Sequence, residues 1–511
     1  MRILLLFILV FASRQLSAQL AEPLIGSEYN TSKKENFSGF LGENSLAVFT
    51  ADYLYYSRRK QELIIRKFHK GDLQLINSEN IYTEIKDGYT NEPEEIFYQN
   101  DTLFLFSKLY SERDKTRLLA LQTFDNNCNQ IESSIVDTLK GDEISYIEVS
   151  SSKDGFLLAS HLKYTQLIEQ EIDLIRINRK GTVAWRKTIR SPMALQSLRI
   201  EQIRFNTDDS PLFILCNYAF DLSSGSANER LINNNYSIWS YDHKQEFLKE
   251  FDLRLKSKWV NGIQMKLTPS SELVVAGYFN ESKNPAINGV FSLKVSKKLK
   301  LLSTSWHKFE SDLMDKFFQN RNINKDVELS DYQLKNLALL KDGSFFLLGE
   351  QYYKYVERSY DPRTNITTTT EHYNYNSIIA SYFDRRGNHK WSERISKSQG
   401  STNDFGYFSS FCLLNSGQDI YLIFNDSRKN NESPPGDYYS YNSVFNNRRS
   451  QISYVHLTPS GIKSRGGLMD ESYSHVLRAK LSGQISENSI YLITEANRSA
   501  KIVRVTAKES D

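Results

Sequence analysis

The sequence predicts an all-β protein, a β-propeller of eight four-stranded blades, with seven blades as the alternative count. Two observations lead to this prediction. Long amphipathic helical patterns are nearly absent, and short apolar segments rich in β-branched and aromatic residues alternate with Gly, Asn, Asp and Ser, which is typical of strands and turns. In addition, one strand–turn–strand pattern recurs along the chain, and repeats of this kind are typical of propeller blades.

The repeat is a short strand, a polar turn and then a strongly apolar strand. Clear copies lie at residues 100–106, 154–159, 208–215, 269–276, 342–348 and 416–423, and weaker copies lie at 43–49 and 486–493. Each interval also contains a second hairpin, such as residues 173–185. Eight copies with four strands each predict the eight blades.

The last unit ends one strand short. Its strands are expected near 475–481, 489–494 and 501–506, where the chain stops. Residues 23–29 precede the first complete unit and can supply the missing outer strand. We therefore expect this N-terminal segment to pair with the last blade, which closes the ring without leaving an open sheet edge.

The first residues have the pattern of a secretory signal peptide. Arg2 precedes an apolar run at 3–12, and Ala18 provides a small residue for cleavage. The run is shorter than a membrane span. We expect a signal peptide at 1–18 and a single propeller domain at 19–511, without a transmembrane segment in the mature chain. The expected location is the periplasm or the periphery of the outer membrane.

Charge and cysteine content limit the expected partners and redox chemistry. The formal net charge is +3, and removal of Arg2 and Arg14 with the signal leaves 3 − 2 = +1. This balance gives no electrostatic reason to expect nucleic acid as a partner. The three cysteines, Cys128, Cys216 and Cys412, lie far apart in the sequence, and we expect no disulfide.

Two of the second hairpins resemble the repeat of PQQ-like and related WD40-like propellers. Trp185 and Trp391 each follow a turn glycine by four residues, in segments 177–187 and 383–393. The chain as a whole is also similar to exported Bacteroidota propellers of unknown function. The resemblance implies that each tryptophan docks one blade on the next, and it implies little about activity. Because the vicinal cysteines and acidic cluster of quinone-dependent dehydrogenases are not recognised, no cofactor is expected.

Extra residues are concentrated at connections that we expect on one face of the ring. The insertions are 217–236, 310–331, 352–376 and 425–450, whereas the hairpins of the other face stay short. They are rich in Tyr, Asn, Ser and Arg, which are common in adaptable binding surfaces. The alternative is that they are tolerated insertions, or hairpins that pack on one another. The predicted contact residues are Tyr353, Tyr355, Arg358, Tyr373, Tyr375, Arg428, Tyr438, Tyr439 and Tyr441.

The insertion at 310–331 differs from the others because apolar residues between 309 and 318 recur at helical spacing. This pattern predicts a short amphipathic helix that packs on the body of the protein. The alternative is a helix that docks a partner.

Catalytic and metal-binding motifs are not recognised in the sequence, and no metal is expected. The two weak catalytic candidates are Glu350 and Asp426, which follow apolar strands at equivalent positions. A pair of carboxylates near the axis is the machinery of many glycosidases. The leading interpretation is a non-catalytic exported propeller that binds an envelope protein or a glycan through one face. The alternatives are a carbohydrate-active enzyme and a structural subunit of a cell-envelope assembly.

Overall fold

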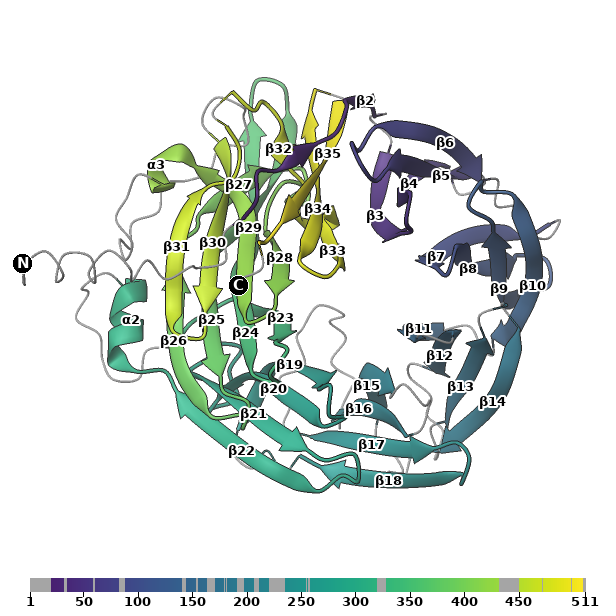
Figure 1. Ribbon diagram of the computed structural model, residues 1–511, viewed down its shortest axis with the longest axis horizontal. Helices are drawn as coiled ribbons and strands as arrows, with labels where there is room; N and C mark the ends of the chain where they lie inside the picture. Colours follow the sequence, from purple (N-terminus) through teal and green to yellow (C-terminus); the bar gives the residue numbers. More distant parts are fainter. Residues whose placement is uncertain are drawn as a thin grey trace, which may run out of the picture.

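The strands form eight antiparallel sheets that follow one another along the chain and surround a common centre (Figure 1). This arrangement is seen in a computed structural model of the protein. It describes residues 20–508, with gaps at 32–34, 58–59, 82–87, 140–143, 153–154, 163–170, 179, 181, 191–196, 206–210, 220–234, 254, 256–257, 319–327, 432–449, 471 and 498.

Sheets 1 to 4 occupy the N-terminal half. Sheet 1 contains β3 (Glu35–Glu43), β4 (Ala47–Ser57), β5 (Lys60–His69) and β6 (Leu75–Ile81). Sheet 2 contains β7 (Thr90–Gln99), β8 (Thr102–Ser111), β9 (Thr116–Phe124) and β10 (Gln130–Leu139). Sheet 3 contains β11 (Ile144–Ser152), β12 (Gly155–Leu162), β13 (Glu171–Asn178) and β14 (Val183–Arg190). Sheet 4 contains β15 (Ser197–Phe205), β16 (Leu212–Ala219), β17 (Tyr236–Asp242) and β18 (Phe247–Asp252).

Sheets 5 to 7 continue the series. Sheet 5 contains β19 (Trp259–Leu267), β20 (Leu273–Asn280), β21 (Gly289–Val295) and β22 (Leu301–Lys308). Sheet 6 contains β23 (Tyr332–Leu339), β24 (Phe345–Asp361), β25 (Ile366–Phe383), β26 (His389–Ile395) and the added β27 (Gln399–Thr402). Sheet 7 contains β28 (Phe411–Ser416), β29 (Asp419–Ser427), β30 (Ser450–Thr458) and β31 (Gly461–Gly467).

Sheet 8 combines the two ends of the described chain. It contains β32 (Val476–Leu477), β33 (Gly483–Ser486), β34 (Ser489–Ala496) and β35 (Ser499–Thr506), together with β1 (Leu24–Ile25) and β2 (Tyr29–Asn30). The described helical segments are α2 (Ser311–Phe318), α3 (Arg428–Asn431) and η1 (Ala479–Leu481). No helix among the described residues is long and apolar enough to cross a membrane.

The core lies between neighbouring sheets. In sheets 1 to 7 the first strand is nearest the centre and the fourth is at the rim, as β3 and β6 show in Figure 1. In sheet 5 every residue of the second and third strands, β20 and β21, is buried, and β8, β9, β17 and β29 of other sheets are mostly buried too. Such strands read as continuous apolar runs because both of their faces pack against a neighbour. One cluster, for example, joins Phe213 and Ile238 of sheet 4 to Val275 and Phe291 of sheet 5.

A recurring polar contact also links successive sheets. At several junctions, a side chain of one sheet donates a hydrogen bond to a carbonyl in the turn between the third and fourth strands of the next sheet. The contacts are Lys67 Nζ to Asn126 O (3.3 Å), Lys249 Nζ to Lys298 O (2.7 Å), Lys294 Nζ to Arg385 O (2.6 Å) and Trp391 Nε1 to Pro459 O (2.8 Å). We call this contact the turn latch.

The turn latch also explains the two hairpin tryptophans. Trp391 of sheet 6 reaches sheet 7 through its indole N–H. Trp185 of sheet 3 instead stacks on His243 in the equivalent turn of sheet 4, with ring centroids 4.9 Å apart. The prediction that these residues dock one sheet on the next is confirmed.

The N-terminal segment pairs with the last strand of the chain. Both β1 and β2 are antiparallel to β35, in the position where counting strands predicted a missing outer strand. Tyr29 packs with Val48 and Phe68 of sheet 1 and with Ile502 of sheet 8. Sheets 8 and 1 are also joined by a turn latch, since Arg504 Nη1 donates to Lys70 O at 3.0 Å.

The contacts around Gly26 provide a test of this pairing. Its N–H donates to Ile502 O, and a Cβ placed there would lie 2.5 Å from Leu73 O. We expect Gly26→Ala to lower the free energy of unfolding by about 1–3 kcal/mol, because the crowded segment has to shift. Gly483→Ala is the matched control in the same sheet, since its added Cβ would meet nothing within 4 Å. Urea denaturation of both variants measures the difference, and equal midpoints would contradict the observed packing.

Candidate functional site

Residues 352–376 form a two-stranded arm that extends beyond the rest of sheet 6. The strand β23 accompanies β24 only as far as Gln351, and β26 leaves β25 at Ile378. Beyond these points β24 and β25 stay paired with each other up to the pair Asp361 and Ile366. The tyrosines and Val356 of β24 and the threonines at 367–370 favour this extended structure. The insertion is therefore a hairpin, as one of the alternatives predicted, but it continues its own sheet and does not pack on another described hairpin.

Cross-strand side chains hold the arm together. Lys354 Nζ lies 2.6 Å from Glu371 Oε1, and the rings of Tyr355 and His372 stack with centroids 4.4 Å apart. His372 Nε2 also lies 3.0 Å from Glu357 Oε2. Each such pair contributes about 0.2–1 kcal/mol. Together they make the arm an ordered element of the sheet.

The two edges of the arm differ. On one side, β27 pairs with β25 between His372 and Tyr375 and covers the base of the arm. On the other side, no described strand pairs with β24 beyond Gln351. An unpaired strand edge presents backbone donors and acceptors to any extended segment that approaches it.

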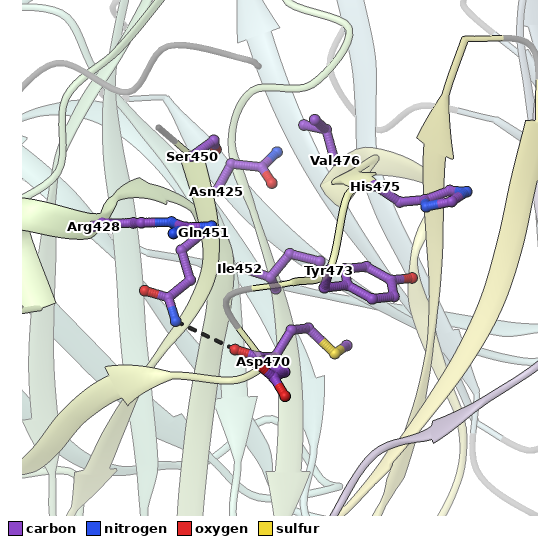
Figure 2. Close-up of a pocket in the computed structure, with 10 residues that line it drawn as sticks. Asn425, Arg428, Ser450, Gln451, Ile452, Asp470, Tyr473, His475 and Val476 are labelled. Atoms are coloured by element: carbon purple, nitrogen blue, oxygen red, sulfur yellow. Dashed lines mark hydrogen bonds between the residues drawn. The ribbon is translucent and has the colours of Figure 1, made fainter. Parts of the chain in front are cut away.

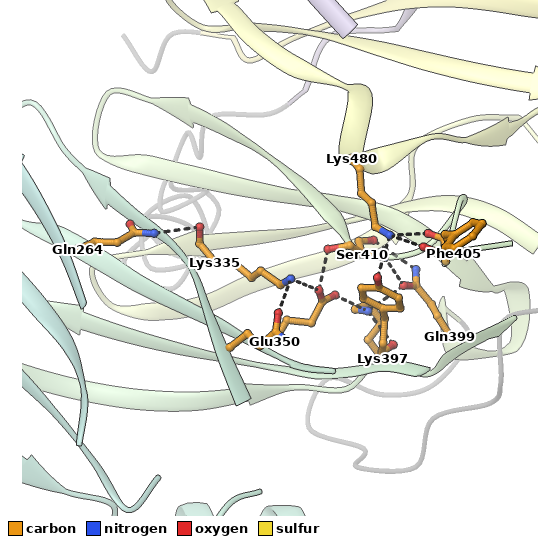
Figure 3. Close-up of polar contacts among 11 residues, drawn as sticks. Gln264, Lys335, Glu350, Lys397, Gln399, Phe405, Ser410 and Lys480 are labelled. Carbon is orange, nitrogen blue, oxygen red and sulfur yellow. Dashed lines mark hydrogen bonds and ion pairs between the residues drawn. The ribbon is translucent and has the colours of Figure 1, made fainter. Parts of the chain in front are cut away.

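A buried polar network anchors the base of the arm (Figure 3). Glu350 and Lys397 are fully buried, with Glu350 Oε1 at 2.8 Å from Lys397 Nζ. Ser410 Oγ donates to Glu350 Oε2 at 2.6 Å, and Lys397 Nζ also donates to Tyr375 O and to Gln399 Oε1, both at 2.9 Å. Burial lowers the pKa of Lys397, and the neighbouring charge of Glu350 opposes that shift. We call Glu350, Lys397, Gln399 and Ser410 the base network.

Lys480 of sheet 8 lies beside the base network and adds to the anchorage of the arm (Figure 3). Its ammonium donates to Tyr375 Oη (2.8 Å), Gly406 O (2.8 Å) and Phe405 O (3.1 Å). Although much of its stem is exposed, desolvation of the ammonium and then the charge of Lys335 lower the pKa of Lys480 to about 8. The arm, the segment that follows β27 and sheet 8 are thereby tied together.

The two catalytic candidates are fully buried within ion pairs. Glu350 belongs to the base network, and Asp426 contacts Arg465 and accepts a hydrogen bond from Asn430 Nδ2 at 2.7 Å. Each carboxylate is therefore surrounded by hydrogen-bond and ion-pair donors and has no exposed surface for a substrate. Both lie inside the second strand of their sheets, β24 and β29, instead of after a strand as expected, and their contacts are those of structural anchors.

The predicted contact residues fall into three groups. Tyr353, Tyr355 and Arg358 lie exposed on the arm, with Tyr355 50% exposed. Tyr373 and Tyr375 point to the other face of β25 and are only 3% and 6% exposed, because residues 403–410 cover them. This placement corrects the expectation that both are contact residues. In the third group, Arg428 is half-buried, and Tyr438, Tyr439 and Tyr441 lie outside the described residues.

Four exposed apolar residues of this region were not singled out from the sequence. They are Val356 (48% exposed), Tyr360 (59%), Ile366 (58%) and Phe405 (76%). Val356 and Tyr360 could have been found from the sequence, because residues at even spacing along a strand share one face and these two lie on the face opposite Tyr353 and Tyr355. Phe405 had no local signal, since its exposure follows from the path of the segment after β27.

The pocket beside α3 is small (Figure 2). It is lined by Asn425, Arg428, Gln451, Tyr473 and His475 among others, and Gln451 Nε2 donates across one side to Met469 O at 3.3 Å. Its volume of about 10 Å³ accommodates about one water molecule. This pocket is therefore not a site for an organic ligand.

Helix α2 packs on the body of the protein. Leu313 and Met314 are buried in a cluster with Phe309 and residues of sheets 5 and 6. Lys316 Nζ also pairs with Glu393 Oε2 at 2.8 Å. The prediction that the apolar stripe of this helix faces the body is confirmed.

Comparison with known proteins gives a likeness of architecture only. No family model and no curated protein matches the chain. The WD40 domain of SCAP from fission yeast is 9% identical with a TM-score of 0.41, and the match covers 96% of this chain and 99% of that one. The β-propeller domain of the Trilobed protease from Pyrococcus furiosus is 9% identical with a TM-score of 0.34, covering 82% and 98%. Since both TM-scores are below 0.5, the description of the fold rests on the sheets themselves.

The base network leads to a prediction about stability. We expect Lys397→Met to lower the free energy of unfolding by about 3–5 kcal/mol, because it leaves the buried Glu350 carboxylate without its main partner. Lys354→Met removes a partly exposed pair with Glu371 and should cost less than about 1 kcal/mol. Urea denaturation compares the two variants. Similar losses for both would mean that the base network does not anchor the arm.

The environment of Lys480 leads to a prediction about pH. Because its pKa is lowered to about 8, the fraction of neutral amine should rise through pH 8 in the folded protein. In urea it should instead rise near ~10.4, the value of an ordinary lysine. Competitive acetylation across this pH range, read by peptide mass spectrometry, measures both midpoints. The same midpoint in the folded and the unfolded protein would show that the ammonium is fully hydrated.

Proposed function

We propose that this protein is a non-catalytic exported propeller that binds a partner protein through the arm. The observation that supports this proposal most directly is the combination of an exposed apolar and aromatic surface with a buried anchorage. Tyr353, Tyr355 and Tyr360 are 36%, 50% and 59% exposed on a strand whose base is held by the base network. Exposed aromatic side chains of this kind are enriched where proteins bind one another.

The rigidity of the arm favours binding. A mobile loop has to lose conformational freedom when it binds, and this loss weakens the complex. In the arm, the cross-strand pairs of Lys354 with Glu371 and of Tyr355 with His372 already order the side chains. Tyrosine adds a large contact area with few rotatable bonds. The arm therefore presents its contact residues with little remaining entropy to lose.

The open edge of β24 suggests how a partner is bound. An extended segment of a partner can add as a further strand along Tyr353–Asp361 and use the backbone groups that no described strand occupies. Side chains of that segment would then contact Tyr353 and Tyr355 on one face and Val356 on the other. This mode predicts a partner with an exposed or flexible strand.

We further propose that the eight sheets form a closed ring. Support comes from the junction between sheets 8 and 1, which has the same turn latch as the junctions inside the chain and an apolar cluster around Tyr29. Export and a periplasmic or outer-membrane location are also part of the proposal. They rest on residues 1–18 of the sequence, which lie outside the described residues.

The geometry does not favour the carbohydrate-active enzyme as a second function. An acid–base pair has to reach its substrate, and both Glu350 and Asp426 are fully buried. A glycan is the alternative ligand of the exposed tyrosines, whereas in a structural subunit the whole ring would act as a spacer and its partners would not depend on the arm. The experiment below distinguishes these outcomes from the proposed one.

The test uses an arm-shortened variant in which residues 354–373 are replaced by Asn-Gly. Tyr353 and Asn374 are direct partners in the ladder, so a two-residue turn can join them without changing the register. Tagged wild type, this variant and the control Ile131→Ser are expressed from the full chain, crosslinked in cells and compared by quantitative mass spectrometry. Ile131 is a suitable control because it is 61% exposed on β10 of sheet 2, in another part of the ring.

We expect a protein partner that is retained by wild type and by Ile131→Ser and lost, by at least about tenfold, in the arm-shortened variant. The intact mass of the purified wild type should correspond to loss of residues 1–18. An unchanged set of crosslinked proteins in the arm-shortened variant would overturn the proposal. Arm-dependent retention on a polysaccharide, without a protein partner, would replace it with glycan binding.

A further inference from the structure

The turns between the third and fourth strands of sheets 3 to 6 carry exposed basic side chains, and the strands that follow carry exposed apolar ones. Exposed lysines and arginines occur in or next to each of these turns. They are Lys180, Lys244, Lys297, Lys298, Lys300, Arg385, Arg386 and Lys390. The fourth strands of sheets 3, 4, 5 and 7 begin with exposed apolar residues: Val183 (43% exposed), Phe247 (59%), Leu301 (43%), Leu302 (47%) and Ile462 (39%). We call these two sets together the basic–apolar arc.

The arc is continuous because neighbouring turns are joined. Lys187 of sheet 3 contacts Glu246 in the turn of sheet 4, and Lys249 of sheet 4 donates to Lys298 O in the turn of sheet 5. The turn latches from Lys294 to Arg385 O and from Trp391 to Pro459 O continue this chain to sheet 7. The fourth strands β14, β18, β22, β26 and β31 follow one another along the rim in Figure 1.

The arc lies on the face opposite the arm. The strand β25 runs from the tip of the arm at Ile366 to the turn after Phe383. Its two ends therefore lie at opposite ends of sheet 6, and these ends correspond to the two faces of the proposed ring. The turn latches join the turns between the third and fourth strands of neighbouring sheets, so these turns lie on the same face as the turn after Phe383. A partner on the arm and a surface on the arc therefore do not compete for the same face.

The charge of the arc differs from that of the corresponding turns in sheets 1 and 2. There the exposed turn residues are Gly71, Asp72, Gln74, Asn127 and Asn129, and the one lysine, Lys70, is half-buried with its Nζ 2.9 Å from Glu43 Oε1. The acidic residues near the arc are engaged locally, since Glu246 contacts Lys187 and Asp384 Oδ2 lies 3.0 Å from Lys390 Nζ. Among the described turns between third and fourth strands, exposed lysines and arginines are thus concentrated in sheets 3 to 6, although the whole chain is nearly balanced.

We propose that the basic–apolar arc binds the surface of an anionic lipid bilayer. Lysine and arginine near such a surface are attracted to the phospholipid headgroups, while neighbouring apolar side chains insert at the boundary with the acyl chains. This combination distinguishes a bilayer from a nucleic acid or another soluble polyanion, which would attract the charges but would not bind Phe247, Leu301 and Leu302. The proposal does not depend on the partner of the arm.

The experiment is co-sedimentation of the purified protein with vesicles. One set contains phosphatidylcholine with phosphatidylglycerol, and the other contains phosphatidylcholine alone. We expect binding to the anionic set only, weakened by added sodium chloride because the attraction is screened. A duplex DNA is titrated in parallel as a soluble polyanion.

Three variants separate the two contributions. The triple change Lys297→Gln, Lys300→Gln and Arg386→Gln should weaken vesicle binding roughly a hundredfold, at about fivefold for each charge. The triple change Phe247→Ser, Leu301→Ser and Leu302→Ser should weaken vesicle binding by at least about tenfold with the charges intact. The control, Leu75→Ser with Ile76→Ser, removes exposed apolar residues from β6 of sheet 1, outside the arc, and should bind as wild type does.

Because all the changed side chains are exposed, each variant should keep the urea midpoint of the wild type, and this is measured first. Absence of wild-type binding to anionic vesicles would overturn the proposal. So would anionic binding that the serine variant leaves unchanged and that duplex DNA matches in strength, since the arc would then be a general polyanion surface.

Discussion

Each sheet of this protein has to bury both of its faces, and no sheet can do so alone. The second and third strands are apolar on both sides, as β20 and β21 illustrate, so every sheet needs a neighbour on the left and on the right. A row of such sheets leaves two apolar faces exposed at its ends unless the ends meet. In the closed ring that we propose, the packing of Tyr29 and Ile502 against Val48 and Phe68 covers these two faces. Apolar packing alone does not fix how one sheet is positioned on the next. The turn latch does, because its hydrogen bond is made to one particular carbonyl of the neighbouring turn.

The arm shows how such a scaffold can carry an additional element. A two-stranded hairpin that leaves its sheet is marginally stable in water. Here its base is fixed by Glu350 and Lys397, which lie where solvent cannot screen their charges. A buried ion pair of this kind adds little net stability compared with apolar residues of the same size, but each partner strongly penalises arrangements in which the other is missing. Its contribution is best understood as specifying one position of the arm.

Much of the fold could be predicted from the sequence, because the signals are local. Turn residues before apolar strands marked the repeat, and the tryptophans after turn glycines marked contacts between sheets. The pairing of the N-terminal segment followed from counting strands. The contacts that determine the candidate site involve residues farther apart in the sequence. Glu350 was recognised as an acid at a strand end, but its partner Lys397 comes from another segment and is apparent only once β25 and β26 have folded between them.

The two sets of exposed residues were predictable to different extents. Alternation along β24 placed Tyr353 and Tyr355 on one face, yet the burial of Tyr373 and Tyr375 depends on the path of residues 403–410. The basic turns are visible in the sequence at 296–302 and 384–390, but the balanced net charge of the chain concealed them. Only the order of the sheets brings these short segments side by side along one rim.

The length of β25 has a mechanical consequence. Its 18 residues form one uninterrupted strand, roughly 60 Å of extended backbone at ~3.3 Å per residue, from the arm tip to the opposite turn. A load applied at the tip is carried along this backbone into the centre of sheet 6. Because the tip joins β24 to β25, a pull there moves both strands and acts in shear on their hydrogen bonds to β23 and β26, so that many of these bonds resist together instead of opening one after another. Tension on a partner bound at the arm is therefore transmitted to the body of sheet 6 before the two strands of the arm separate.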